Sequence, residues 1–172
     1  MMRVHIFERP VCSRKLGIFL LASAMCLGCA AGIWLSFGAE EGFADARHVL
    51  SAPAEGAAPV VISLLPLLLS AAAVYVRQPV FLLPLAFWKV LFFSYVFSGF
   101  MSVWIGGDWL VCSLGMFSAI CSLPVLCWYW LRHIGGQEFC LGTFCPALAV
   151  VTALSLMDLY VISPFLAKIL IY

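Results

Sequence analysis

The stretch LGIFLLASAMCLGCAAGIWLSF, residues 16–37, runs for 22 residues without a charged side chain. A helix needs about 20 mostly apolar residues to cross the hydrocarbon core of a bilayer. The stretch is continuously apolar and does not alternate between apolar and polar residues, as a half-buried strand does. It therefore predicts a membrane-spanning helix, preceded by a short polar segment that carries four basic residues, Arg3, Arg9, Arg14 and Lys15.

The composition of the whole chain agrees with a membrane protein. Hydrophobic residues make up 65% of the 172 residues and charged residues 10%, whereas roughly a quarter of an average globular chain is charged. The mean hydropathy is +1.13. A formal net charge of +1 argues against nucleic acid as a partner, because nucleic-acid binding requires a basic patch. The lipid bilayer is therefore the expected solvent and first partner of the chain.

Four further apolar runs follow, separated by short polar segments. Only helices and closed barrels satisfy the backbone in lipid, and unbroken apolar runs favour helices. The sequence thus predicts an all-α, polytopic transmembrane bundle with about five spans, residues 16–37, 59–76, 80–105, 109–131 and 141–170. Residues 1–15 are predicted to be a basic cytoplasmic segment and residues 16–172 a single transmembrane domain. Residues 38–58 are predicted as an outer loop and residues 132–138 as a polar inner loop.

The basic residues set the expected orientation, because Lys and Arg concentrate on the cytoplasmic side of membrane proteins. With the N-terminus inside, the outer loops contain only Arg47, whereas the inner segments contain Arg3, Arg9, Arg14, Lys15, Arg77 and Arg132. Five spans then place the C-terminus outside. A cleavable signal peptide is the rival interpretation of the N-terminal region. It is disfavoured because the apolar run continues past Cys29 to Phe37.

Two charges lie within predicted spans, Lys89 and Asp158. An intramembrane ionisable residue is a functional-site hypothesis by default. If the third helix begins at Pro84, Lys89 lies five residues into it, about 7–8 Å deep at 1.5 Å per residue. Its stem could then reach the inner headgroups. Two roles therefore stay open for Lys89: contact of its ammonium with the inner headgroups, and pairing with a group inside the bundle.

Asp158 has a short side chain that cannot reach far, so it is expected to face the bundle or a wet crevice. The candidate partners are Lys89, Tyr160, Ser163 and hydroxyls of the third helix. A direct Lys89–Asp158 pair is disfavoured, because the predicted spans separate the two residues by roughly 10 Å along the membrane normal. A structural hydrogen bond to a hydroxyl is favoured over a functional role.

Small residues recur at helical spacing in two of the predicted spans. Gly28 and Gly32 form a GxxxG pattern in the first span, and Ser94 and Ser98 are spaced by four residues in the third. Such spacing lets two helix backbones approach closely. Packing within the bundle is the predicted role, and association of two copies is the second.

Signatures of catalysis and metal binding are absent from the sequence. It contains no GxSxG and no HExxH. Of its eight cysteines only Cys26 and Cys29 form a CxxC pair, which lies inside the first apolar run, and all eight are expected to behave as small apolar residues. The six tryptophans are expected to anchor the spans at the two interfaces. We therefore expect no enzyme activity, no catalytic residue, no metal and no cofactor.

Two stretches carry a family resemblance. FWKVLFFSY, residues 87–95, leads into residues 109–124, which end in Leu-Pro, and MDLYVISPFL, residues 157–166, places an acidic residue before an aromatic, β-branched residues and Pro. Both stretches resemble the stage II sporulation protein M family of bacterial membrane proteins, over about residues 14–172. The resemblance implies a non-enzymatic, multi-pass protein of the bacterial inner membrane.

The resemblance also implies a role and partners. The namesake of the family acts in engulfment during endospore formation and helps to hold peptidoglycan-degrading proteins at the septal membrane. A scaffold of this kind would meet extracytoplasmic cell-wall hydrolases or other membrane proteins through the outer loop, at Glu40, Glu41 and Asp45. The alternative is a membrane transport component, a permease subunit or small-solute carrier, that uses Lys89 and Asp158.

Overall fold

The computed structural model of the chain describes residues 14–38, 58–103, 113–134 and 138–171. Every regular element in these ranges is helical, so the predicted all-α class is confirmed for them. In chain order the elements are α1 (Arg14–Ser36), α4 (Ala58–Tyr75), the 3₁₀ turn η1 (Pro79–Phe81), α5 (Leu82–Val103), α7 (Phe117–His133), α8 (Leu141–Met157), the π-helical turn η2 (Asp158–Ile162) and α9 (Ser163–Ile171).

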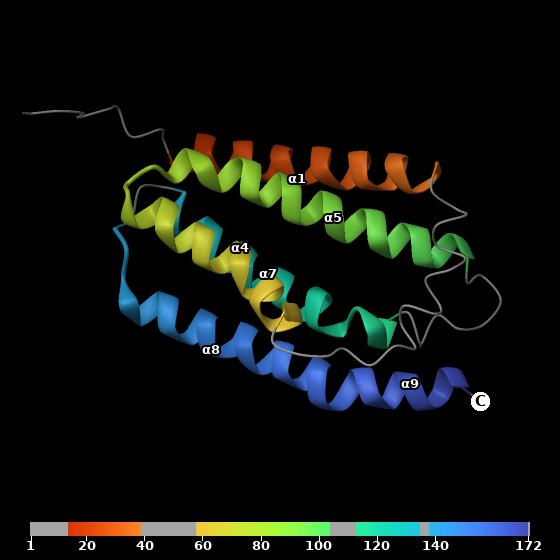
Figure 1. Ribbon diagram of the computed structural model, residues 1–172. Coiled ribbons are helices and arrows are strands. Elements are labelled where there is room, and N and C mark those ends of the chain that lie inside the picture. The colour runs from red at the N-terminus through yellow and green to blue at the C-terminus, as the bar shows by residue number, and fades with distance from the viewer. Residues whose placement is uncertain (1–13, 39–57, 104–112, 135–137, 172) are drawn as a thin grey trace, which may run out of the picture.

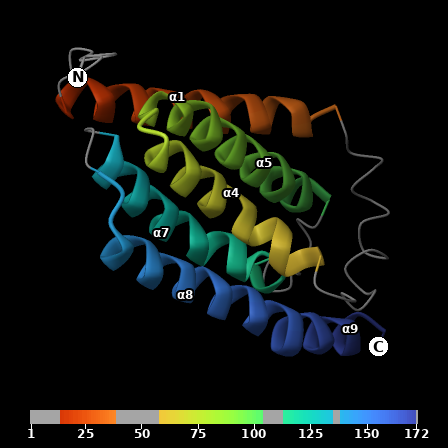
Figure 2. The ribbon, with the colours of Figure 1, turned by 60° about the vertical axis from the view of Figure 1, so that its left-hand side comes forward.

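The helices form a bundle of long rods. Figures 1 and 2 show α1 beside α5, with α8 and α9 on the opposite side of the molecule and α4 and α7 between them. Gly28 of α1 lies against Phe87 of α5, and Ser36 lies against Ser98, so these two helices run in the same direction. The start of α4 lies against the end of α8, because Ser63 is hydrogen-bonded to Ser155.

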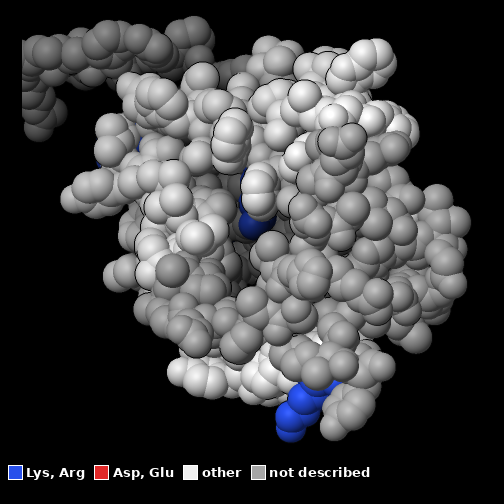
Figure 3. Space-filling view, turned by 45° about the vertical axis from the view of Figure 1, so that its right-hand side comes forward, with Lys and Arg blue, Asp and Glu red and all other residues white. Residues whose placement is uncertain are grey.

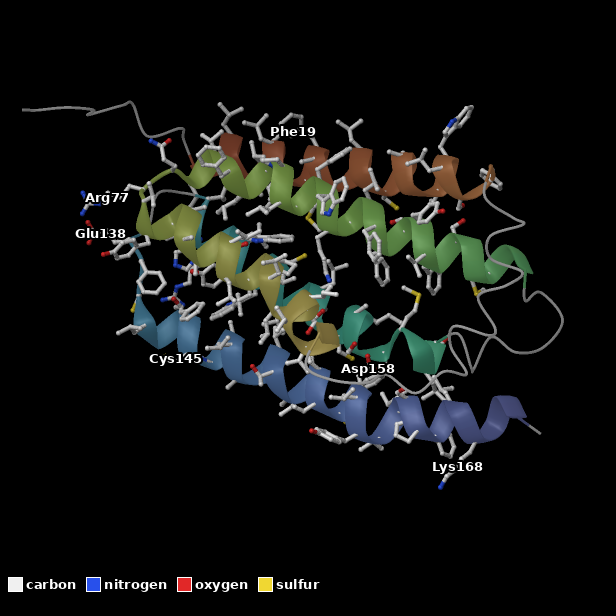
Figure 4. All side chains as sticks on the ribbon, in the orientation of Figure 1. Phe19, Arg77, Glu138, Cys145, Asp158 and Lys168 are labelled. Carbon is white, nitrogen blue, oxygen red and sulfur yellow. The ribbon has the colours of Figure 1, made fainter. Side chains whose placement is uncertain are left out.

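One end of the bundle, here called the basic end, gathers exposed cations. Gly17 near the start of α1 contacts Ile134, which follows α7. Arg77, after α4, pairs with Glu138 before α8 at 2.9 Å, and Figure 4 shows the two side chains facing each other. Four exposed basic residues lie at this end, Arg14, Lys15, Arg77 and Arg132. The C-terminus lies at the other end (Figure 1).

Apolar side chains cover much of the outside of the bundle. Three helical stretches are long and apolar enough to cross a membrane: Arg14–Ser36, Leu82–Gly99 and Leu141–Leu166. Between 22% and 28% of the residues in their most apolar segments are buried. The protein itself therefore leaves most of this apolar surface exposed. Phe19, for example, is 67% exposed and points away from the bundle in Figure 4. This surface is compatible with a membrane protein, because lipid can cover it.

Two predicted boundaries need correction. Helix α5 begins at Leu82, directly after η1, and takes Pro84 into its first turn, where the missing N–H of proline costs no hydrogen bond. Lys89 is therefore seven residues into the helix, about 10 Å from its start. Helix α7 continues to His133, so the predicted loop from residue 132 begins too early. His133 is helical and 1% exposed.

Helix α4 ends in a turn that places an arginine where glycine is preferred. The Arg77 N–H donates to the Val74 carbonyl at 3.0 Å, and the Gln78 N–H donates to the Ala73 carbonyl at 2.9 Å. This is the Schellman arrangement, whose C′ residue has a positive φ. Arg77 has φ 59°, the one positive φ among the non-glycine residues described. A side chain in this conformation is strained by about 1 kcal/mol.

We expect Arg77→Gly to raise the free energy of unfolding in detergent by about 0.5–1 kcal/mol, because glycine removes the strain. The lost pair with Glu138 offsets little of this gain, since both side chains are at least 80% exposed and exposed pairs contribute little. Gln78→Gly, one residue further, is the control and should not stabilise the protein. Destabilisation by Arg77→Gly would show that the ion pair outweighs the strain.

Candidate functional site

Asp158 opens the π-helical turn η2 between α8 and α9. The Ser163 N–H donates to the Asp158 carbonyl, five residues back, instead of four as in an α-helix. Pro164 follows directly, and a proline ring collides with the carbonyl four residues before it. We attribute the wide turn to this proline, because an added residue per turn makes room for the ring. Turns of this kind within α-helices are frequent at functional sites.

The Asp158 side chain ties this turn to α7. The Ser118 hydroxyl donates to Asp158 Oδ2 at 2.9 Å, in a partly buried position, and Figure 4 shows Asp158 between the α8–α9 rod and α7. The predicted kind of contact, a hydroxyl bond, is present, but its donor lies on the fourth predicted span, not the third. Tyr160, another candidate partner, is 73% exposed. No ion pair joins Lys89 to Asp158 in the described part of the chain.

A second hydroxyl contact lies one turn before Asp158. Ser155 is hydrogen-bonded to Ser63 of α4 and donates to the Val151 carbonyl of its own helix. Helix α8 and η2 are therefore joined to α4 through Ser63 and to α7 through Ser118. Hydrogen bonds between helices in a membrane contribute about 0.6 kcal/mol on average and up to about 1.7 kcal/mol.

A double-mutant cycle should detect the Ser118–Asp158 contact. We expect Ser118→Ala and Asp158→Ala to show a coupling of about 1 kcal/mol in the free energy of unfolding, because each removes one partner of the same bond. Ser63→Ala combined with Ser118→Ala is the control, since the two serines bond different residues, and this pair should be additive. Additive effects of the Ser118 and Asp158 substitutions would contradict a direct bond.

Lys89 lies at the edge of the packed face of α5. Ala86 and Val90 beside it are buried, whereas Trp88 is 66% and Phe92 is 55% exposed. Lys89 alone is half-buried among the Lys and Arg residues that the structure describes. Its ammonium makes no hydrogen bond or ion pair to any residue of the described ranges. It is therefore a candidate binding group and not part of the helix-to-helix contacts.

The four small residues singled out in the sequence meet at the contact between α1 and α5. A Cβ atom added at Gly28 would lie 2.5 Å from the Phe87 carbonyl oxygen. One added at Gly32 would meet the Leu91 carbonyl and lie 2.8 Å from the Tyr95 amide nitrogen.

Two serines of α5 complete the same contact. Ser94 is 6% exposed, and its Cβ is 2.9 Å from the position of a Cβ on Gly32. Ser36 donates to Ser98 at 2.9 Å. The structure thus places Gly28, Gly32, Ser94 and Ser98 in one interface where two backbones touch.

Sequence reasoning missed a buried polar and aromatic cluster near the basic end. Trp130 Nε1 donates to Ser70 Oγ at 2.8 Å, and Ser70 donates to the Pro66 carbonyl at 2.6 Å. His133 Nδ1 lies 2.8 Å from the Tyr129 carbonyl, and the two rings are 4.3 Å apart. Trp130 is fully buried, so its predicted role as an interfacial anchor is wrong. A helical projection of α7 would have found the cluster, because Leu126, Trp130 and His133 share one face.

The outer-loop residues Glu40, Glu41 and Asp45 lie outside the described residues. In the ranges that are described, no three His, Cys, Asp or Glu side chains gather into a group that could hold a metal ion. Four hydrogen bonds between described side chains join neighbouring helices. They link Asp158 to Ser118, Ser155 to Ser63, Ser36 to Ser98, and Trp130 to Ser70.

Comparisons of the chain with protein families, with curated proteins and with solved structures found no match. The resemblance to the stage II sporulation protein M family stays a prediction.

Proposed function

We propose that this protein is a non-enzymatic scaffold that spans a bacterial inner membrane five times, with the N-terminus inside and the C-terminus outside. The observation that supports a scaffold most is that its polar side chains form hydrogen bonds between helices. Four separate contacts hold one helix to another, and two glycines bring the backbones of α1 and α5 together. Such contacts favour a fixed bundle over one that must open and close around a solute.

The charge distribution supports the proposed orientation. Arg14, Lys15, Arg77 and Arg132 are all exposed at one end of the bundle, which the positive-inside rule assigns to the cytoplasm. The five rods of the proposal are α1, α4, η1–α5, α7 and α8–η2–α9. The last contains 31 residues, about 46 Å at the helical rise, against a hydrocarbon core of about 30 Å. Its final turns, with the exposed Lys168, would therefore reach the outer headgroups.

The outer loop is the proposed contact with partners. Helix α1 ends at Ser36 and α4 begins at Ala58, and both points lie away from the basic end. The acidic residues Glu40, Glu41 and Asp45 would then face the extracytoplasmic space. Cell-wall hydrolases or other membrane proteins are the proposed partners, in keeping with the family resemblance.

Site-specific photo-crosslinking tests the scaffold. A photoreactive amino acid at position 41 or 45 should capture an extracytoplasmic protein in living cells, and mass spectrometry should identify it as a cell-wall hydrolase or a membrane protein. The same amino acid at position 137, on the proposed cytoplasmic side, is the control and should not capture that protein. Equal capture at position 137, or none at positions 41 and 45, would contradict the proposal.

A transport component is the second candidate, favoured by the ammonium of Lys89, for which the described part of the chain offers no hydrogen-bond or ion-pair partner. Proteoliposomes would accumulate a solute in this case, and Lys89→Met would abolish the uptake. A scaffold predicts no uptake by the wild-type protein.

A further inference from the structure

The floor of a hollow on the bundle carries a positive charge. Figure 3 shows Lys or Arg atoms at the bottom of a hollow on one face of the molecule. Lys89 is the half-buried basic residue of the described ranges, and it lies in the first half of α5. The Lys89 ammonium has no hydrogen-bond or ion-pair partner among the described residues. An anion is therefore its favoured ligand, because burial without a counter-charge is costly.

The surroundings of Lys89 decide which kind of anion fits. Trp88 and Phe92, the neighbours on the outward side of α5, are large, apolar and more than half exposed. In a bilayer these side chains lie against acyl chains, and tryptophan is enriched at the level of the headgroups. A soluble anion would have to leave water to reach this place. An anionic lipid brings its own acyl chains to the apolar surface and its phosphate to the ammonium.

The depth of Lys89 selects the leaflet. The helix begins at Leu82 at the basic end, and Lys89 follows about 10 Å later. A lysine stem extends along apolar surface toward the nearer interface. Basic residues between helices on the cytoplasmic side are suited to anionic lipid headgroups.

We propose that Lys89 binds the phosphate of one anionic phospholipid from the leaflet at the basic end, with the acyl chains beside Trp88 and Phe92. This proposal rests on the proposed membrane orientation, but it does not require a protein partner. The photo-crosslinking experiment tests the scaffold, and the lipid-binding experiment tests the lipid site. Either proposal can therefore fail while the other holds.

Lipid binding by the purified full chain tests the proposal. Native mass spectrometry in mild detergent, with equal amounts of phosphatidylglycerol and phosphatidylcholine supplied, should show one phosphatidylglycerol bound to the wild-type protein. We expect Lys89→Met to weaken this binding about fivefold or more and Lys89→Arg to retain it. Lys168→Met is the matched control, because it removes the same charge from an exposed position on α9, and it should leave the binding unchanged.

Three results would overturn the proposal: equal phosphatidylglycerol binding by Lys89→Met and Lys168→Met, equal binding of the two lipids by the wild type, or displacement of the lipid by millimolar inorganic phosphate. The last would assign the site to a free anion.

A measurement on the wild-type protein covers the case in which Lys89→Met fails to fold. Phosphatidylglycerol with a photoreactive acyl chain should crosslink to the peptide that contains Trp88 and Phe92, and crosslinks elsewhere only would contradict the site.

Discussion

Gly32→Val is expected to lower the free energy of unfolding by about 3 kcal/mol and to separate α1 from α5. The added Cβ would meet the Leu91 carbonyl and the Tyr95 amide nitrogen, which are backbone atoms that cannot rotate away. Overpacking a close contact usually costs 1–3 kcal/mol, and the upper end applies where the obstacle is backbone. Denaturant titration of the purified protein in mild detergent measures the loss.

Ala30→Val is the matched control for Gly32→Val. Ala30 lies on the same helix two residues earlier and is exposed, so the added methyl groups would point into lipid or detergent. Its effect on the free energy of unfolding should stay within about 0.5 kcal/mol. Equal effects of the two substitutions would mean that valine disturbs α1 itself and not its contact with α5.

Trp130→Ala is expected to have the largest effect, a loss of about 4 kcal/mol in the free energy of unfolding. The indole is fully buried in the core with Leu67, Val74 and Leu126. Truncation leaves a cavity and also removes the bond from Nε1 to Ser70 Oγ. Trp130→Phe should recover most of the loss, because it refills the space without the hydrogen bond.

Trp128→Ala tests whether the loss of stability in Trp130→Ala comes from the burial of Trp130 and not merely from replacing a tryptophan. Trp128 lies on the same helix, two residues before Trp130, and is 44% exposed. We expect its replacement to cost less than half as much, because part of its surface is covered by lipid or detergent in any case. A cost equal to that of Trp130→Ala would show that α7 packs in another way.

Long apolar runs allowed the helices to be predicted closely. The first span was predicted over residues 16–37 and is helical over Arg14–Ser36, and the second was predicted over residues 59–76 and is helical over Ala58–Tyr75. The first run follows Arg14 and Lys15, and the second ends before Arg77. A helix can also satisfy its backbone in lipid without help from distant residues. This part of the fold is local, so the sequence specifies it.

The partners of each side chain could not be predicted in the same way. Ser118 and Asp158 are 40 residues apart, and their contact depends on how α7 and α8 lie together. The π-helical turn at Asp158 arises from Pro164 within an otherwise regular helix, and apolar spacing does not reveal it. Trp130 and Trp128 are adjacent to the same polar segment, but only their positions around α7 decide which one is buried.

Paired reporter fusions test most directly whether five spans cross the membrane with the N-terminus inside and the C-terminus outside. Alkaline phosphatase fused after Tyr172 should be active and green fluorescent protein fused there should be dark, because the C-terminus is proposed to lie outside. Fusions after Gln78, at the basic end, should give the reverse pattern. Fluorescence at both Gln78 and Tyr172 would place these two points on one side of the membrane and contradict the five-span orientation.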